Sequence, residues 1–304
     1  MTYKIIIAYI LDLIFGDPYN IPHPISYIGK LVKKMEKVFY PFKNKKVSGI
    51  FFNLSVLFII YLIFYFIAKV KILEIYFLYT IFATKSLVKE SKKVYIALKN
   101  EDIDEARKYL SYLVSRDTKE LNKEEIIKGT LETCSENITD GIIAPMFFMF
   151  IGGLPLAMTY KAINTMDSMV GYKTSKYIDF GWFSAKIDDF VIFIPARISG
   201  LIFIPVSALF LSLNFKNSLK VFFRDRLNHS SPNSAHTESS LAGALGLQLG
   251  GPTKYFGEVE HKKYIGDKLR EFEVNDILLT HKVIYVSSFV GLCFFVVFEL
   301  LFSH

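Results

Sequence analysis

Carboxylate and amide side chains gather at both ends of an uncharged apolar run, residues 141–160. The flanking groups are Glu136, Asn137, Asp140, Lys161, Asn164 and Asp167. Glu136 and Asp140 lie one helical turn apart, so in a helix their carboxylates share a face and suit Mg²⁺, which prefers oxygen ligands. Helix capping by Thr139 or Asp140 is the alternative interpretation. Because capping does not account for Glu136, the pattern favours a metal site.

A polar stripe follows the apolar run. At helical spacing Lys161, Asn164 and Asp167 fall on one face, and apolar residues fill the opposite face. A solvated helix end beyond a membrane span is the alternative, and the one-sided arrangement of polar groups weakens it. Asp188 and Asp189 continue the acidic pattern further along the chain. We predict that these side chains line a polar site.

Arg197 lies inside the apolar segment 190–213. A charged group in or beside hydrocarbon is costly, so it is retained where chemistry or transport requires it. The guanidinium needs a partner, which is a carboxylate of Asp167, Asp188 or Asp189, or else a phosphate or carboxylate of a ligand. The sequence leaves both possibilities open.

The segment 231–252 begins with a turn that contains Asn233 and Ser234 and continues past His236 into a helix of small residues. Backbone N–H groups at such a turn, together with the helix dipole, can hold a phosphate. Close helix packing through residues such as Gly243 is the alternative, and we expect each in a different half of the segment. The sequence has no G-x-x-x-x-G-K-[ST] loop, so no standard motif predicts a nucleotide site.

Asp17 and His23 flank a loop in which Pro18, Pro22 and Pro24 favour a rigid, extended chain. One interpretation makes the two side chains lining groups of a site. The other makes the segment a turn that ends the first helix. The local sequence supports the two interpretations equally.

Composition shows which solvent these elements meet. The chain has 304 residues, of which 52% are hydrophobic and 16% aromatic, and its mean hydropathy is +0.33. These values exceed those of soluble domains and predict a membrane protein. The charged fraction is 21% and the net charge is +7, so parts of the chain meet water and anions. We expect membrane lipids and phosphorylated ligands as partners, and no nucleic acid.

The apolar segments that can cross or enter a membrane are 50–68, 72–83, 141–160, 190–213 and 283–302. Pro145, Gly152, Gly153 and Pro155 interrupt the third of them, as in broken or re-entrant helices that line a site. We therefore predict an all-α, polytopic helical membrane protein with about 4–6 membrane segments, broken or re-entrant helices and a cytoplasmic helical region.

Charge sets the predicted orientation. Lysines crowd the segment 30–46, which the positive-inside rule assigns to the cytoplasm. We predict one membrane-embedded domain, residues 1–304, with a cytoplasmic helical segment at 84–140 and a cytoplasmic loop and helix region at 214–282. If 141–160 crosses fully, the polar groups at its two ends are separated. If it re-enters, they share the cytoplasmic face, and we expect re-entry.

Several strings, in order along the chain, together resemble the CobD/CbiB family of cobalamin biosynthesis. They are LDLIFGDPYNIPHPISYIGKL, SRDT, ETCSENITDGIIAP, YKAINTMDSMVGY, DFGWFSAKIDDFVIFIPARISGL and SPNSAHTESSLAGALGLQLGGP. Each string alone is weak. Their combination, which runs from Leu11 to Pro252 and so covers most of the chain, is specific.

The resemblance implies a multi-pass enzyme of the cell membrane, adenosylcobinamide-phosphate synthase, with its active site on the cytoplasmic side. The family reaction joins a propionate carboxyl of adenosylcobyric acid to the amine of aminopropanol phosphate, or of free aminopropanol. It is described as an amide ligation that depends on ATP and Mg²⁺. The implied partners are the corrinoid, the amino alcohol phosphate and other membrane enzymes of cobalamin assembly.

A carboxylate does not react with an amine until it is activated, most simply as an acyl phosphate, and this chemistry suggests roles for the polar residues. Catalytic roles are predicted for His236, Asp167 and Lys161. Substrate or phosphate binding is predicted for Arg197, Asn137, Asn164, Asn233, Ser234, Asp17 and His23. Metal binding is predicted for Glu136, Asp140, Asp188 and Asp189, with Asp167 as a further candidate.

Two other functions could use the same residues. A Mg²⁺-dependent membrane phosphoalcohol transferase would employ the acidic groups without hydrolysing ATP, and a small transporter would place ionisable groups along a translocation path. Transporters are commonly built from two related halves, and no internal repeat is visible in this sequence. The amide synthase is therefore the leading prediction.

Overall fold

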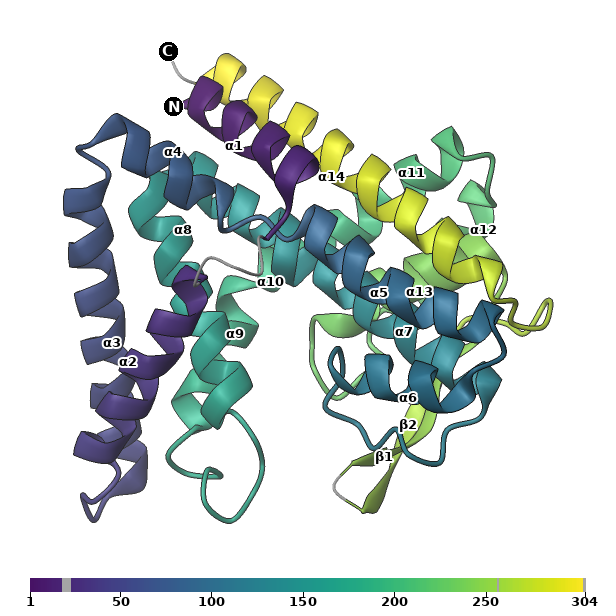
Figure 1. The fold of residues 1–304 in the computed structure, drawn as a ribbon, viewed down its shortest axis with the longest axis horizontal. Helices are drawn as coiled ribbons and strands as arrows, with labels where there is room; N and C mark the ends of the chain where they lie inside the picture. Colours follow the sequence, from purple (N-terminus) through teal and green to yellow (C-terminus); the bar gives the residue numbers. More distant parts are fainter. Residues whose placement is uncertain (18–22, 256, 303–304) are drawn as a thin grey trace. The chain divides into compact units, whose positions relative to one another are not determined.

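The computed structural model describes residues 1–17, 23–255 and 257–302 (Figure 1). The described chain is helical apart from one short β-hairpin. It divides into two compact units. The first comprises Met1–Ala83, Ala144–Ile192 and Phe295–His304, and the second comprises Thr84–Ile143 and Phe193–Phe294.

Long apolar helices confirm the predicted fold class. By length and composition, four helical stretches of the described chain could span a membrane: Lys45–Ile67, Lys123–Val170, Phe193–Phe210 and Asn275–Leu301. The first is helix α3, whose 23 residues would extend for about 35 Å, enough for a bilayer core. Helix α4, Lys71–Tyr79, has 9 residues and is too short to span.

The first unit packs its helices around α3 and α8, Ala144–Val170. Helices α2, Pro24–Phe39, and α9, Trp182–Val191, lie beside α3 (Figure 1). Helix α1, Thr2–Phe15, packs against α4, and the ion pair of Lys4 with Glu74 links them. Asn53 of α3 and Ser184 of α9 exchange hydrogen bonds of 2.9 and 3.1 Å in the buried interface, which satisfies both polar groups without water.

Helix α8 is broken, as the sequence predicts. Gly152 and Gly153 have non-helical backbone angles, and Gly153 has a φ of +63°, which residues with a side chain rarely adopt. Pro155 follows directly and lacks the N–H that an uninterrupted helix would use. The break confirms the interrupted helix, whereas re-entry of 141–160 into one membrane face stays a prediction.

The second unit contains the remaining elements. They are α5 (Thr84–Lys99), α6 (Ile103–Ser111), α7 (Lys123–Ile138), η1 (Thr139–Ile143), α10 (Phe193–Ile198), η2 (Ser199–Phe203), α11 (Ile204–Phe210), α12 (Phe215–Asp225), α13 (Ser234–Leu245), β1 (Leu249–Tyr255), β2 (Glu258–Ile265) and most of α14 (Asn275–Phe302). Helix α13 packs against α7, α11, α12, η2 and the hairpin, so it forms the centre of the unit.

Small residues let the neighbours of α13 approach closely. A Cβ atom on Gly243 would lie 2.5 Å from the carbonyl oxygen of Asn217, and one on Gly200 would lie 2.2 Å from the carbonyl oxygen of His236. Gly246 ends the helix with a φ of +68°. The predicted close packing in the second half of segment 231–252 is therefore confirmed.

Two π-helical turns interrupt the helices of the second unit. Thr139 and Asp140 lie in η1, which connects α7 directly to α8, so the alternative that these residues cap a helix N-terminus is wrong. Segment η2 divides the apolar helix that carries Arg197 from α11. A π-turn widens the backbone and redirects neighbouring side chains, and it is frequent at functional sites.

The hairpin of β1 and β2 was not anticipated in the region 214–282, which was expected to hold loops and helices. Its strands pair antiparallel from Leu249↔Ile265 to Tyr255↔Glu258. Charges at Glu258, Glu260 and Lys263 hide the alternation that normally identifies a strand. The hairpin contacts α7 and α13, the two helices that carry Glu132, Glu136 and Glu238.

Candidate functional site

A buried ion pair lies in the second unit, beside a group of further ionisable side chains. Arg116, from the loop after α6, contacts Glu132 of α7 with 2.5 Å between Nη2 and Oε2, and the side chains are only 10% and 5% exposed. The other carboxylate oxygen of Glu132 accepts the N–H of Gly250 at 2.8 Å. Each partner satisfies the charge of the other, as burial in a low-dielectric interior requires.

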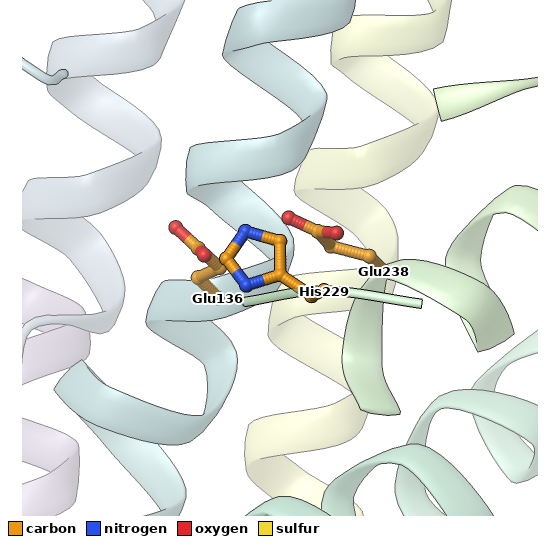
Figure 2. A group of neighbouring side chains, drawn as sticks. All are labelled: Glu136, His229 and Glu238. Atoms are coloured by element: carbon orange, nitrogen blue, oxygen red, sulfur yellow. The ribbon is translucent and has the colours of Figure 1, made fainter. Parts of the chain in front are cut away.

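One helical turn beyond Glu132, three side chains converge from separate elements. Figure 2 shows the imidazole of His229 beside the carboxylates of Glu136 on α7 and Glu238 on α13. One ligand atom from each of the three lies within 4.8 Å of the others. Glu238 is 4% exposed, and its carboxylate makes no hydrogen bond or ion pair within the described part of the chain. We call Glu136, His229 and Glu238 the acidic cluster.

Burial and neighbouring charges shift the pKa values of two residues of the acidic cluster, Glu238 and His229. Burial and the neighbouring carboxylates of Glu136 and Glu132 raise the pKa of Glu238 well above its ordinary value. Burial lowers the pKa of His229, against the opposing attraction of Glu136, so the ring is neutral at pH 7. The protonated form of Glu238 is therefore favoured relative to that of an exposed glutamate.

The environment of His229 fixes its tautomer. The backbone N–H of Ser231 donates to Nδ1 at 2.9 Å, so Nδ1 carries the lone pair. In a neutral imidazole the proton then resides on Nε2. The Nζ of Lys262 on β2 lies 3.4 Å from Nε2 and donates to the hydroxyl of Tyr255 at 2.7 Å.

Arg197 lies at the N-terminal end of α13. Its Nη1 donates to the carbonyl of Phe193 at 2.7 Å and to Oδ1 of Asn233 at 3.1 Å, and its guanidinium lies 3.3 Å from the centroid of the Phe193 ring. Within the second unit, Arg197 has no carboxylate partner among the described ion pairs. Asp167, Asp188 and Asp189 belong to the first unit, so their pairing with Arg197 stays a prediction, as does a ligand anion.

His236 lies beside this arginine and is 2% exposed. Neither ring nitrogen has a hydrogen bond of ordinary geometry within the described residues, although the carbonyl of Pro232 is close. Burial, Arg197 and Arg226 together lower the pKa of His236 to about 4. Arg226 also has no carboxylate partner among the ion pairs of the described chain. Its Nη1 donates to the carbonyl of Phe223. We call Arg197, Arg226, Asn233 and His236 the cationic cluster.

The acidic stripe of the first unit falls on two packed helices. Lys161, Asn164 and Asp167 lie on α8, and Asp188 and Asp189 lie on α9. Lys161 and Asp188 are buried, while Asp167 and Asp189 are half-buried and within electrostatic range of each other. Of the predicted α8 and α9 residues, the structure thus brings Asp167 and Asp189 near each other.

The carboxylate of Asp167 lies against Gly171. A Cβ atom on that glycine would be 2.0 Å from Oδ1 of Asp167, and the Gly171 N–H donates to the Asp167 carbonyl at 2.7 Å. A larger residue at 171 would push the carboxylate away, which gives a physical reason for glycine one helical turn after the aspartate.

His23 begins helix α2. Its Nδ1 accepts the backbone N–H of Ile25 at 3.2 Å, and its Nε2 lies 3.3 Å from Oδ1 of Asp17. His23 therefore caps α2 and Asp17 lies beside its ring, and a role of either residue in substrate binding stays a prediction. The rigid conformation predicted for residues 18–22 lies outside the described residues.

The sequence identified part of each cluster. Glu136 belongs to the acidic cluster, and Arg197, Asn233 and His236 belong to the cationic cluster, with Ser234 beginning α13. Asn137 donates to the carbonyl of Thr133 at 2.8 Å, and Asp140 lies in η1 outside the acidic cluster. His229, Glu238, Arg226 and the Arg116–Glu132 pair were missed. A carboxylate at 238 amid Ser, Ala, Gly and Leu was the available signal.

Asp225 holds the turn that carries His229, and this gives a pH-dependent prediction. Burial raises the pKa of Asp225, but hydrogen bonds from Arg224 and from the Gly266 N–H at 2.8 Å outweigh it and leave that pKa below 3.8. Stability from the ionised carboxylate is therefore fully present above its unfolded pKa and is lost as the pH falls through the lower folded pKa. We expect Asp225→Asn to lower the free energy of unfolding by about 1–3 kcal/mol at pH 7.

Thermal unfolding in detergent across pH checks this expectation. The difference between Asp225→Asn and the unmodified protein should shrink as the pH falls below 3.8. A difference that is independent of pH would contradict an ionised Asp225 as its source.

The fold and the two clusters define a class, a polytopic α-helical membrane protein with buried acidic and cationic groups around one helix. The family model for the CobD/Cbib protein matches residues 5–284. The cobalamin biosynthesis protein CobD of Clostridium perfringens is 47% identical over 300 residues, which cover 95% of each chain. That of Clostridium acetobutylicum is 48% identical with 96% of each chain covered, and CbiB of Salmonella paratyphi B is 40% identical with 95% covered.

The chain therefore belongs to the CobD/CbiB family. No solved structure matches it. The family strings quoted above supply Arg116, Glu132, Glu136, Arg197 and Glu238 to the second unit, so the resemblance and the geometry select the same region.

Proposed function

We propose that this protein acts in cobalamin biosynthesis as a membrane amide synthase, joining a carboxyl group of adenosylcobyric acid to the amine of aminopropanol phosphate. The observation that carries the proposal is the cationic cluster at the N-terminus of α13. Among the described residues, two arginines that form no ion pair with a carboxylate and a buried histidine that makes no ordinary hydrogen bond surround a helix end, where backbone N–H groups favour an anion.

The cationic cluster suits a phosphate or a carboxylate. Arg197 presents a planar guanidinium that is held by Asn233 and by the Phe193 carbonyl, so little side-chain entropy remains to be lost when an anion binds. Arg226 adds a second positive charge. The reaction proposed here has both anions, the phosphate of the amino alcohol and the carboxylate of the corrinoid.

Amide formation also requires a leaving group and a base. ATP, which the family resemblance implies, would supply the leaving group by phosphorylating the corrinoid carboxylate, and ADP and phosphate are then released. The ammonium of the amino alcohol must lose a proton before its nitrogen attacks the carbonyl carbon. His236 is a candidate acceptor of that proton, because its ring lies beside Arg197 and Arg226, which would hold the substrate anion.

We set this chemistry on the cytoplasmic face of the cell membrane. ATP is available there, and the lysine-rich segment 30–46 directs that part of the chain to the cytoplasm. Membrane lipids would surround α3 and the other apolar helices.

The test supplies detergent-purified protein with adenosylcobyric acid, aminopropanol phosphate, Mg²⁺ and ATP, and detects the corrinoid product by mass spectrometry. We expect the amide, formed together with ADP and phosphate in equal amounts. No amide after lipid is restored would contradict the proposal. Amide formation without nucleotide hydrolysis would contradict activation of the carboxylate by ATP.

Asp167→Asn tests the acidic stripe of the first unit. The side chain keeps its size but loses its charge, so the helix should pack as before while any proton transfer or cation binding by the carboxylate is lost. We expect product formation to fall at least about 100-fold and the unfolding temperature to stay nearly unchanged. Full activity of the variant would remove Asp167 from the mechanism without affecting the assignment of the reaction.

A further inference from the structure

We infer that the acidic cluster is a binding site for one hard divalent cation, with the carboxylates of Glu136 and Glu238 as its protein ligands and His229 as a positioning residue beside them. The sequence had placed the metal at Glu136 with Asp140, whereas the second carboxylate of the cluster comes from α13. The role of the ion in catalysis rests on the proposed function, but its binding does not.

The state of Glu238 is the first argument for a ligand. A carboxylate that is 4% exposed normally makes a hydrogen bond or an ion pair, and this one makes neither in the described chain, although the positive charges of Lys262 and Arg116 attract it from further away. Figure 2 shows its carboxylate directed toward the imidazole and toward Glu136. A divalent cation between the two carboxylates would satisfy both and would neutralise their mutual repulsion.

The tautomer of His229 identifies the kind of cation. Ligation by Nε2 needs a lone pair on that nitrogen, and the Ser231 N–H already occupies the lone pair of Nδ1. A neutral ring cannot accept at both nitrogens, so Nε2 carries the hydrogen and is not available as a ligand. The first shell is then made of oxygen atoms, from the two carboxylates and from water, which suits Mg²⁺ or Mn²⁺ and not a metal that selects imidazole.

Lys262 currently supplies positive charge at this place. Its Nζ lies 3.4 Å from Nε2 of His229, and it reaches the cluster from the partly exposed hairpin. The Nε2–H of His229 and the ammonium of Lys262 are both hydrogen-bond donors, so they do not attract each other. The negative charge of the nearby carboxylates, Glu238 among them, attracts the ammonium instead. A divalent cation would compete with this ammonium, and the flexible lysine side chain can withdraw toward solvent.

Titration of the purified full-length protein with Mn²⁺, followed by electron paramagnetic resonance in the absence of corrinoid and amino alcohol, tests the site. We expect one bound Mn²⁺ that Mg²⁺ displaces. Glu136→Gln and Glu238→Gln should each weaken binding at least about 10-fold, whereas the exposed Glu258→Gln on β2 should leave it unchanged. Absence of bound Mn²⁺, or binding that Glu238→Gln does not weaken, would overturn the site.

Two further measurements address the individual residues. Pulsed resonance should show no directly bound ¹⁴N on the Mn²⁺, and a strong ¹⁴N coupling would make His229 a ligand and overturn its positioning role. Lys262→Met should tighten Mn²⁺ binding, because it removes the competing ammonium, and unchanged affinity would contradict that competition. A protein that binds Mn²⁺ but forms no amide would exclude the proposed function while leaving the cation site intact.

Discussion

Arg197→Ala is expected to lower kcat/KM for amide formation about 100-fold or more, because it removes the charge that we propose holds the substrate anion. The protein should stay folded. No buried carboxylate is left unpaired by the change, since the partners of Arg197 in the described chain are the neutral groups of Asn233 and Phe193. The loss should appear in the steady-state rate of corrinoid amide formation.

Two comparisons separate anion binding from general damage. Arg197→Lys keeps a positive charge but not the planar fork, so it should recover only part of the activity. Arg107→Ala removes an arginine from α6, where it pairs with the exposed Asp104, and should leave activity unchanged. If Arg197→Ala retained full activity, the cationic cluster would not be the substrate site.

Arg116→Met is expected to cause the largest loss of stability, about 3–5 kcal/mol. The change leaves Glu132 buried without its counter-ion, close to Glu136 and Glu238, whose charges oppose it. Unfolding by heat or denaturant in detergent measures the loss. The same ion pair would be a poor source of stability at the surface, so burial is the cause of the size of the effect.

Controls for this prediction follow from the same reasoning. Adding Glu132→Leu to Arg116→Met removes the orphaned charge and should restore much of the lost stability, because both charges are then absent. Lys254→Ala breaks an exposed ion pair with Glu120 and should change the free energy of unfolding by less than about 1 kcal/mol. A loss in Arg116→Met that the second substitution does not reverse would point to packing and not to charge.

The membrane helices and the broken helix could be predicted because their signals are local. An uncharged run at 50–68 predicts α3 by itself, and Gly152, Gly153 and Pro155 predict the break in α8. The hairpin at 249–265 was missed because its charged strands lack apolar alternation, and its pairing depends on contacts with α7 and α13. The same local reasoning found Arg197, whose charge contrasts with its neighbours.

The composition of the acidic cluster could not be predicted in this way. Asp140, one turn from Glu136, was the natural local partner in a helix, but the π-turn at 139–143 interrupts that regular spacing. The residues that join Glu136 come from a loop and from α13, far along the chain. The residues around His229 give no local pattern that predicts which helices its ring will lie beside.

The sequence by itself determined that long apolar helices suited to a membrane form, that the fold is helical, and that α8 is interrupted. It also determined which ionisable residue types lie near the apolar helices. These follow from the hydrophobic pattern and from glycine and proline, which act on the chain where they occur. Only the tertiary structure decided which charges are paired. Arg116 pairs with Glu132, Arg197 contacts neutral groups, and Glu238 makes no hydrogen bond or ion pair in the described chain. The physical reason is that the cost of a buried charge depends on neighbours brought in by folding, and it is this cost that marks the candidate site.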